Sequence, residues 1–210
     1  NQWDKGLARL YGYLSQDIVY ANPMNLLVFL DNHDTSRFYK VPPKNNLDRY
    51  KQAIAFLLTV RGIPQIYTGT EVLMAGDKAN GDGALREDFP GGWAGDNRNV
   101  FTATGRNPLE NEAYDYMKKL LHWRAGNEAI SKGSFKHFIP QDGIYVYERH
   151  YGGKSVTVIL NGTDQAKEMN LASYKEVLPK EQSTDVLSGK VIPLKNTLSL
   201  QPRQVFILEF

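Results

Sequence analysis

The amino-acid sequence predicts an α/β region followed by an antiparallel all-β module. Two short apolar runs without alternation, separated by a helical pattern, are typical of two strands of a parallel sheet and the helix that connects them. From about residue 129 the pattern changes to short alternating segments separated by turn dipeptides, which is typical of a small antiparallel sandwich. We therefore expect two domains, over residues 1–128 and 129–210.

The first element is an amphipathic helix that begins at the start of the chain. Its apolar residues recur every three or four positions, as they do on one helix face. They are Trp3, Leu7, Leu10, Leu14 and Ile18. Because this face starts in the first turn, with no initiator Met or polar leader before it, we expect the chain to be the C-terminal part of a longer protein.

The next elements give the order strand, helix, strand. Leu26–Leu30 is a continuous apolar run, which predicts a strand buried on both faces, and it ends in the polar stretch Asp31–Arg37. Leu47–Val60 is a mostly apolar helical pattern that Gly62 closes. Ile63–Tyr67 is a second short strand. This order fits an α/β layer fold or part of a barrel.

A long irregular stretch and a third helix complete the α/β region. Residues 69–107 contain eight glycines, and loops of this length in compact domains are usually functional or disordered. Asn107-Pro108 then starts a helix over residues 109–125. Its expected inner side consists of Leu109, Tyr116, Leu120 and Leu121.

The all-β module is predicted from six alternating segments. They are Phe135–Ile139, Ile144–His150, Ser155–Leu160, Thr184–Leu187, Thr197–Leu200 and Gln204–Phe210. Turn dipeptides such as Asp142-Gly143 and Gly152-Gly153 stand between them. We expect this module to fold without the rest of the chain.

Composition excludes several classes of function. The chain has 210 residues, 41% hydrophobic and 23% charged, which is ordinary for a globular protein. Its 25 Lys and Arg barely exceed its 23 Asp and Glu and form no cluster, so no nucleic-acid partner is expected. The apolar runs are far shorter than the roughly 20 residues of a membrane span. Without cysteine, the chain has no disulfide, thiol nucleophile or cysteine metal site.

The polar stretch after the first predicted strand is the best candidate site, because ligands of parallel sheets bind at the carboxyl ends of the strands. The alternative is a solvated loop in which Asp34 or Ser36 caps a short turn. His33-Asp34 also fits a metal site. The other histidines, His122, His137 and His150, lie far along the chain, so we expect no metal.

Two motifs resemble those of glycoside hydrolase family 13, the α-amylase family. Phe29–Asp34 is similar to the seventh-strand motif of that family, and Gly62–Glu71 is similar to its eighth-strand motif. They occur in the family's order, about 30 residues apart, with a helix between them. The resemblance covers the whole chain. It implies that residues 1–128 are the C-terminal part of a (β/α)8 TIM barrel, its last two strands and helices, and that residues 129–210 are the small β-sandwich that follows the barrel.

The resemblance also implies roles for single residues. Asp34 matches the third essential carboxylate of the family, His33 the neighbouring histidine that hydrogen-bonds the sugar, and Asn32 belongs to the same substrate-binding motif. Hydrogen bonds that strengthen as the sugar ring distorts stabilise an oxocarbenium-like transition state. Asp82 and Arg86 resemble a pair that contacts a donor-side sugar, although such a pair can equally staple the loop.

The loop that follows resembles one group of family members. Asp88–Trp93 is similar to a segment of neopullulanase- and cyclomaltodextrinase-like enzymes. Phe89, Trp93 and Phe101 can stack on sugar faces, but aromatic loop residues more often pack the loop down.

The motifs of the fourth and fifth strands are absent, and with them the nucleophile and the acid/base. Asp88 lies in a Gly-x-x-Arg-x-Asp lookalike that no strand precedes, so we do not expect it to be the nucleophile, and Glu71 is not the acid/base. A retaining mechanism needs two carboxyl groups about 5–5.5 Å apart. We expect the chain alone to be inactive, and its α/β region to need the missing N-terminal portion, self-association or partial rearrangement.

We therefore expect the parent protein to be a retaining hydrolase of α-1,4 or α-1,6 glucosidic bonds in starch, pullulan or maltodextrins. The resemblance implies no cofactor for this chain and calcium only for the parent. An alternative is a non-catalytic carbohydrate-binding or structural module, with Tyr145, Tyr147 and Tyr151 on one strand face either as a sugar platform or, more often, as packing. A relative that has lost catalysis and serves as a transporter subunit or regulator is a third. The lack of cysteine fits a bacterial periplasm or cytoplasm.

Overall fold

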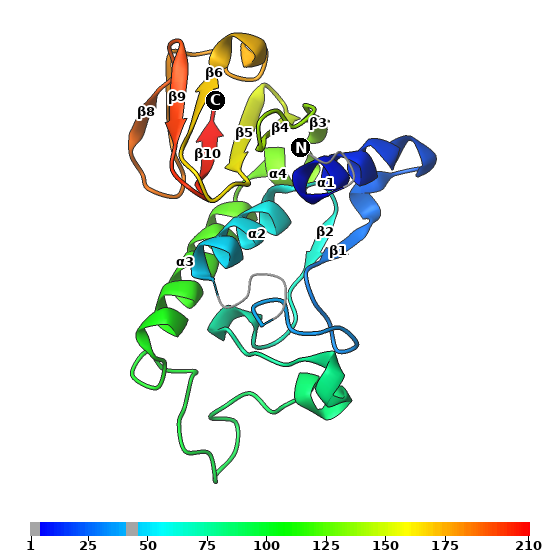
Figure 1. Ribbon diagram of the computed structural model, residues 1–210, viewed down its shortest axis with the longest axis vertical. Coiled ribbons are helices and arrows are strands. Elements are labelled where there is room, and N and C mark those ends of the chain that lie inside the picture. Colours follow the sequence, from blue (N-terminus) through cyan, green and yellow to red (C-terminus); the bar gives the residue numbers. More distant parts are fainter. Residues whose placement is uncertain (1–4, 41–45) are drawn as a thin grey trace. The chain divides into compact units, whose positions relative to one another are not determined.

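A computed structural model describes residues 5–40 and 46–210 (Figure 1), so the predicted position of Trp3 lies outside the described residues. The chain divides into two compact units that are not continuous in sequence. One contains residues 5–26, Thr59–Ile63 and Trp123–Phe210, and the other contains residues 27–40, 46–58 and Pro64–His122. The domain boundary at residue 128 stays a prediction.

The first helix is shorter than its apolar pattern. α1 spans Gly6–Leu14 and continues as a 3₁₀ turn over Ser15–Val19. Leu14 is buried, whereas Ile18 is 92% exposed, so the prediction that Ile18 shares this face was wrong. The tighter winding of the 3₁₀ turn rotates Ile18 off the 3.6-residue stripe.

β1 (Leu27–Phe29) and β2 (Ile63–Gln65) form a two-stranded sheet. The prediction that the first strand is buried on both faces was wrong, since Leu27 is 55% exposed and Phe29 is 44% exposed. Burial on both faces needs further strands and layers. Among the described residues this sheet has only its two strands, so its apolar side chains stay open to solvent.

α2 spans Leu47–Thr59 between these strands, as the sequence predicts. The Asn46 side chain caps it by accepting a hydrogen bond from the Arg49 amide at 2.9 Å. Gly62 follows the end of the helix with a φ of +101°, a conformation that favours glycine. Tyr50, Ile54 and Leu58 form a fully buried stripe at four-residue spacing, and the fully buried Ala55 and Thr59 lie next to it.

α3 spans Pro108–Ala125 and begins with a reciprocal cap. The Asn107 side chain accepts from the Glu110 amide (3.0 Å), and the Glu110 carboxylate accepts from the Asn107 amide (2.9 Å). This cap turns Glu110 inward. The expected inner positions Leu109 and Leu121 were therefore wrong, since these residues are 50% and 36% exposed. The buried stripe is Glu110, Ala113, Met117 and Leu120.

The stretch 69–107 is irregular, as predicted, and contains only short 3₁₀ turns. These are Thr70–Val72, Lys78–Asn80 and Asp82–Leu85. Gly76 lets two parts of the stretch approach closely, because a Cβ at this position would stand 2.0 Å from the carbonyl oxygen of Ala84. Within the described residues, no helix combines the length and the apolar character that crossing a bilayer requires.

The C-terminal part begins with α4 (Glu128–Lys132) and then consists of antiparallel strands. The main sheet has the order β10-β5-β4-β3, and two further pairs are β6-β9 and β7-β8. The strands are β3 (Ser134–His137), β4 (Ile144–Tyr151), β5 (Lys154–Asn161), β6 (Lys167–Asn170), β7 (Gln182–Thr184), β8 (Val191–Pro193), β9 (Thr197–Leu200) and β10 (Val205–Glu209). Sequence reasoning missed α4, β6 and β8, which are short and polar or contain proline.

One predicted strand is displaced. The expected Thr184–Leu187 strand ends at Thr184, because Asp185 begins a turn instead. Its carboxylate accepts hydrogen bonds from the backbone amide and the hydroxyl group of Ser188, at 2.8 and 2.6 Å. Such an Asx turn competes with strand pairing.

β4 is buried on both faces. Ile144 and Val146 belong to the main apolar core together with residues of β5, β6, β9 and β10. On the other face Tyr145 and Tyr147 have no exposed surface, and only Tyr151 is exposed, at 42%. The alternation of tyrosines therefore serves packing, and the sugar platform considered for them was wrong.

Arg149 occupies the same buried face of β4 and is fully buried. Its guanidinium donates to the carbonyl oxygens of Gly133 (2.8 Å), Ser134 (3.1 Å), Thr59 (3.2 Å) and Val60 (2.9 Å). Carbonyl groups thus satisfy a cation at the C-terminal end of α2, where the helix dipole favours positive charge.

Candidate functional site

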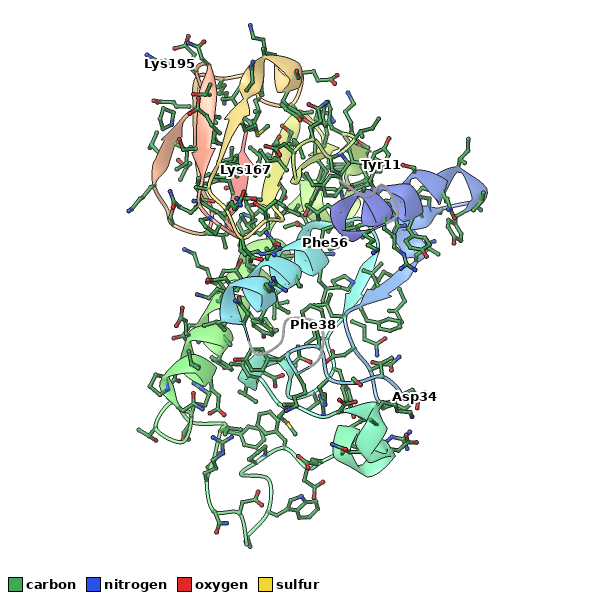
Figure 2. All side chains as sticks on the ribbon, in the orientation of Figure 1. Tyr11, Asp34, Phe38, Phe56, Lys167 and Lys195 are labelled. Carbon is green, nitrogen blue, oxygen red and sulfur yellow. The ribbon has the colours of Figure 1, made fainter. Side chains whose placement is uncertain are left out.

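The polar stretch that follows β1 separates into a buried and an exposed set. Asp31 and Arg37 are each 2% exposed, whereas His33 and Asp34 are exposed and Asn32 is half-buried. Figure 2 shows Asp34 in this loop, beyond the end of β1. The outer residues of the stretch form one face of the candidate site, and the inner pair holds the loop.

Asp31 anchors the loop from inside. Its Oδ2 accepts a hydrogen bond from the Phe38 amide at 2.9 Å, and its Oδ1 accepts one from the Thr70 hydroxyl at 3.2 Å. Burial raises the pKa of the Asp31 carboxyl above its usual value, although these hydrogen bonds and the Arg37 guanidinium oppose the shift.

The turn around Asp34 is capped by its neighbours. Asn32 Oδ1 accepts from the Asp34 amide (2.9 Å), and Thr35 Oγ1 accepts from the Asn32 amide (3.1 Å). Ser36 instead bonds to the glycine-rich stretch, accepting from the Lys78 amide at 2.9 Å. The expected cap by Asp34 or Ser36 was therefore wrong, and the Asp34 carboxylate is left to face other side chains.

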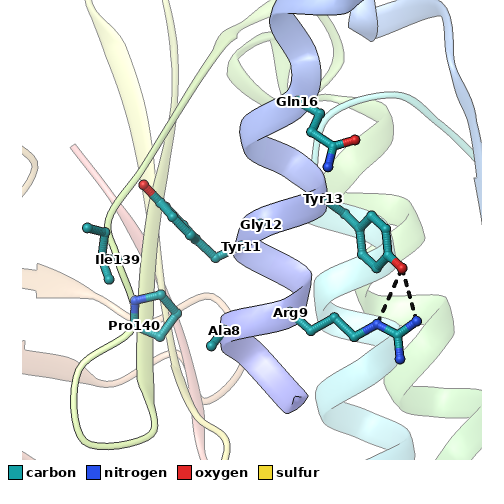
Figure 3. A pocket seen from close by; sticks show the side chains of 8 residues that line it. All are labelled: Ala8, Arg9, Tyr11, Gly12, Tyr13, Gln16, Ile139 and Pro140. Atoms are coloured by element: carbon teal, nitrogen blue, oxygen red, sulfur yellow. Dashed lines mark hydrogen bonds between the residues drawn. The ribbon is translucent and has the colours of Figure 1, made fainter. Parts of the chain in front are cut away.

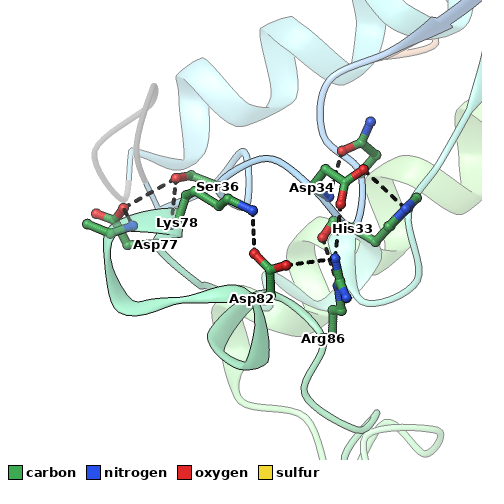
Figure 4. Close-up of polar contacts among 9 residues, drawn as sticks. His33, Asp34, Ser36, Asp77, Lys78, Asp82 and Arg86 are labelled. Atoms are coloured by element: carbon green, nitrogen blue, oxygen red, sulfur yellow. Dashed lines mark hydrogen bonds and ion pairs between the residues drawn. The ribbon is translucent and has the colours of Figure 1, made fainter.

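Five residues from two loops meet in one exposed group, which we call the polar cluster: His33, Asp34, Lys78, Asp82 and Arg86 (Figure 4). Arg86 Nη2 donates to Asp34 Oδ1 (2.9 Å) and to Asp82 Oδ2 (3.0 Å), and Arg86 Nε donates to the His33 carbonyl oxygen (3.1 Å). His33 Nε2 lies 3.3 Å from Asp34 Oδ2, and Lys78 Nζ pairs with Asp82 Oδ1. All the predicted site residues of both loops thus lie in or beside one cluster.

Charge within the cluster is balanced between two carboxylates and two cations. The hydrogen bond and charge of Lys78, with a smaller contribution from Arg86, hold the pKa of Asp82 below its usual value. Side chains in the cluster are 45–62% exposed, so both carboxylates are open to solvent. Such a surface offers acceptors and donors to a polyhydroxylated ligand.

Aromatic residues of the long loop were considered for two roles, stacking on a sugar and packing within the loop. Phe89 and Phe101 pack against each other with ring centroids 4.6 Å apart. Trp93 is 67% exposed, and its turn is held by Asp96, whose Oδ2 accepts from the Trp93 amide at 3.1 Å. Phe101 is also 63% exposed, so the rings of Trp93 and Phe101 are both open to a ligand.

The described residues contain no group of three or more His, Cys, Asp or Glu side chains placed to share a metal ion. Two apolar cavities are lined by residues outside the polar cluster. One, of about 630 Å³, lies between α1 and the segment after β3, lined by residues that include Tyr11, Tyr13 and Ile139 (Figure 3). The other, of about 340 Å³, is lined by residues of α3 and of the segment after β2.

Sequence reasoning missed Lys78 and Arg37. Lys78 has the i,i+4 spacing to Asp82 that favours an ion pair, a signal present in the sequence. For Arg37 no such local signal exists, because its partners Thr68 and Leu85 lie 31 and 48 residues away.

Comparison with known protein families gives two matches along the chain. Residues 8–145 match the alpha amylase catalytic domain. The chain belongs to the α-amylase family. Residues 135–209 match the cyclo-malto-dextrinase C-terminal domain. Both motif assignments made from the sequence therefore identified the family correctly.

Curated relatives of this α-amylase family chain are cyclomaltodextrin glucanotransferases and amylases. A cyclomaltodextrin glucanotransferase of Bacillus sp. (strain 6.6.3) is 36% identical over 81% of this chain and 21% of its own length. That of Thermoanaerobacterium thermosulfurigenes is 33% identical over 88% of this chain and 22% of its own length. The chain thus spans about a fifth of these relatives.

Solved structures confirm the fold class. The α-amylase of Geobacillus thermoleovorans, complexed with acarbose, matches 98% of this chain and 43% of that chain, with a TM-score of 0.77 and 26% identity. The gamma-CGTase of alkalophilic Bacillus clarkii matches 97% of this chain and 29% of that chain, with a TM-score of 0.75 and 27% identity. The chain is part of a TIM-barrel catalytic region followed by an antiparallel β domain, as the sequence predicts.

Proposed function

We propose that this chain contributes the sugar-binding side of the active site of a retaining α-glucan hydrolase. One observation carries the proposal: Asp34 and Arg86, 52 residues apart, meet directly in an exposed cluster after the strands β1 and β2. Family membership supplies the chemical context, because relatives of this chain are named cyclomaltodextrin glucanotransferase and alpha-amylase.

In this proposal Asp34 accepts hydrogen bonds from hydroxyl groups of the sugar at the cleaved bond. As the ring flattens toward an oxocarbenium ion, those hydroxyl groups move, and bonds to a fixed carboxylate strengthen. His33 binds the same sugar from beside Asp34. Asn32 holds the turn that presents Asp34, and Asp82 and Arg86 bind the next sugar on the donor side.

The nucleophile and the acid/base are proposed to lie outside this chain. Asp88 follows a 3₁₀ turn and not a strand, which supports its exclusion as a nucleophile. The chemistry needs no cofactor from these residues, and we expect calcium only in a longer protein. We also propose that the open side chains of β1 and β2, Leu27, Phe29 and Ile63, are covered by other barrel strands or by self-association.

The test is release of reducing ends from maltohexaose, β-cyclodextrin and pullulan. It compares this chain with a form extended at its N-terminus to include the fourth- and fifth-strand motifs. In the extended form, Asp34→Asn is expected to lower kcat/KM by about 10²-fold or more, the equivalent of about 3 kcal/mol of transition-state stabilisation. Asp88→Asn makes the same change of charge at another exposed carboxylate, in the stretch 69–107, and is expected to have little effect.

Two results would contradict the proposal. Turnover by the 210-residue chain alone would place the nucleophile and acid within it. Equal losses for Asp34→Asn and Asp88→Asn would remove the special role of Asp34. Because the substrates differ in linkage and shape, the same assay also gives the bond preference.

A further inference from the structure

Arg37 is a buried cation behind the polar cluster. Its side chain donates from Nε to the Leu85 carbonyl oxygen (3.0 Å) and from Nη1 to the Thr68 carbonyl oxygen (2.6 Å). The guanidinium also lies over the Tyr67 ring, with Cζ 3.8 Å from its centroid. A planar guanidinium fixes two acceptors at a set separation, which a lysine ammonium does not. Arg37 therefore sets the spacing between the end of β2 and the loop at Leu85.

The segments that Arg37 joins carry both members of the central ion pair. Leu85 directly precedes Arg86, and Asp34 stands three residues before Arg37. The Arg37 amide also donates to the Gly76 carbonyl oxygen at 2.8 Å, so side chain and backbone together hold both loops. Through its side chain and its backbone amide, Arg37 therefore contributes to the position of Arg86 relative to Asp34.

Stability alone does not explain the choice of arginine at this position. Any buried donor within reach would satisfy a single carbonyl oxygen, whereas the guanidinium satisfies two at a fixed separation. An apolar residue, however, would leave the Thr68 and Leu85 carbonyls without a shared partner, and the two loops would be free to shift. Displacement of a binding group by about 1 Å is enough to lower a catalysed rate by about 10²-fold.

We propose that Arg37 is a positioning residue for glucan hydrolysis. It acts without touching the sugar, by holding Arg86 against Asp34 and the His33 carbonyl. This inference rests on the proposed function of the polar cluster, but the positioning itself is measurable in the chain without activity.

The first measurement is hydrogen exchange of the Arg86 Nε–H group by NMR in the 210-residue chain. Arg37→Met and Arg37→Lys are compared with Arg149→Met, a matched change of another arginine that is buried among carbonyls. Both Arg37 variants are expected to speed this exchange by about tenfold or more, because the bond to the His33 carbonyl opens more often. Arg149→Met is expected to lower stability without this effect.

The second measurement is steady-state kinetics of the extended form on maltohexaose. Arg37→Met is expected to lower kcat by about 10²-fold with KM changed by less than about threefold, and Arg37→Lys to recover part of the loss. If Arg37→Met does not fold, the exchange rate and the kinetics are both measured on Arg37→Lys.

Wild-type Arg86 exchange in a folded Arg37 variant would overturn the positioning role. Faster exchange with an unchanged kcat would overturn its part in catalysis. An Asp34→Asn variant that keeps full activity would instead refute the proposed function, while leaving the exchange result intact.

Discussion

Replacement of Arg149 by methionine is expected to destabilise the protein by about 2–4 kcal/mol. The guanidinium of this fully buried residue donates to four carbonyl oxygens, two of them, those of Thr59 and Val60, at the C-terminal end of α2. Methionine fills a similar volume but has no donor. The substitution therefore removes the Arg149 donor from all four carbonyls, together with the charge that balances the helix dipole.

The size of the effect is the difference between two opposing terms. A buried carbonyl that loses its donor destabilises the folded state by about 1–3 kcal/mol. With the middle of this range for each, the loss at four carbonyls is about 8 kcal/mol. Removal of the charge stabilises the folded state by several kcal/mol, because the buried cation no longer has to be desolvated. That desolvation penalty also lowers the pKa of the Arg149 guanidinium to about 10. A net loss of about 2–4 kcal/mol corresponds to a fall in Tm of about 4–16 °C.

The assay is urea unfolding followed by far-UV circular dichroism. Arg149→Lys keeps the charge but cannot reach four carbonyls at once, so its stability is expected to lie between those of wild type and Arg149→Met. Lys136→Met on β3 is the control, because its ion pair with Glu176 is more than half exposed and contributes at most about 1 kcal/mol. Arg149→Met as stable as wild type would refute the reasoning and show that desolvation outweighs the hydrogen bonds.

Two further predictions concern the α/β unit. Gly76→Ala is expected to lower stability by about 1–3 kcal/mol in thermal unfolding, because its Cβ would stand 2.0 Å from the Ala84 carbonyl oxygen, whereas Gly83→Ala has open space and is expected to be neutral or slightly stabilising. Equal effects at the two positions would contradict this. Because burial raises the pKa of Asp31 above 3.8, the folded state binds its proton more tightly, and this contribution to stability is lost as pH rises through the raised pKa. Wild type should therefore gain stability over Asp31→Asn as pH falls from 7 toward 4 in urea titrations, and a difference that does not change with pH would show that Asp31 does not titrate there.

Local patterns predicted most of the elements of this fold. Asn107-Pro108 and Gly62 mark helix ends because their effects act within a few residues, and the structure has α3 and α2 where they indicate. Burial was harder to predict. Leu27 and Phe29 form a strand as expected, but their exposure depends on which other strands cover them, which no local pattern records.

The candidate site was predictable where its residues form motifs. His33 and Asp34 stand in one motif, and Asp82 and Arg86 in another, so each pair could be found by itself. That the two pairs meet depends on contacts across about 50 residues. Arg37 was not predictable as their link, since a single arginine in a polar loop gives no sign that it is 2% exposed.

Because the two units are discontinuous in sequence, they can complete their folding only in a certain order during synthesis. The unit that contains the β strands also contains residues 5–26 and Thr59–Ile63, and it cannot close before Trp123–Phe210 has left the ribosome. The other unit has all its residues available once His122 has emerged. Until Arg149 on β4 has emerged, the carbonyl oxygens of Thr59 and Val60 lack this donor. In a nascent chain between these two points, all residues of the polar cluster have been made, whereas the strands that complete the unit of α1 have not.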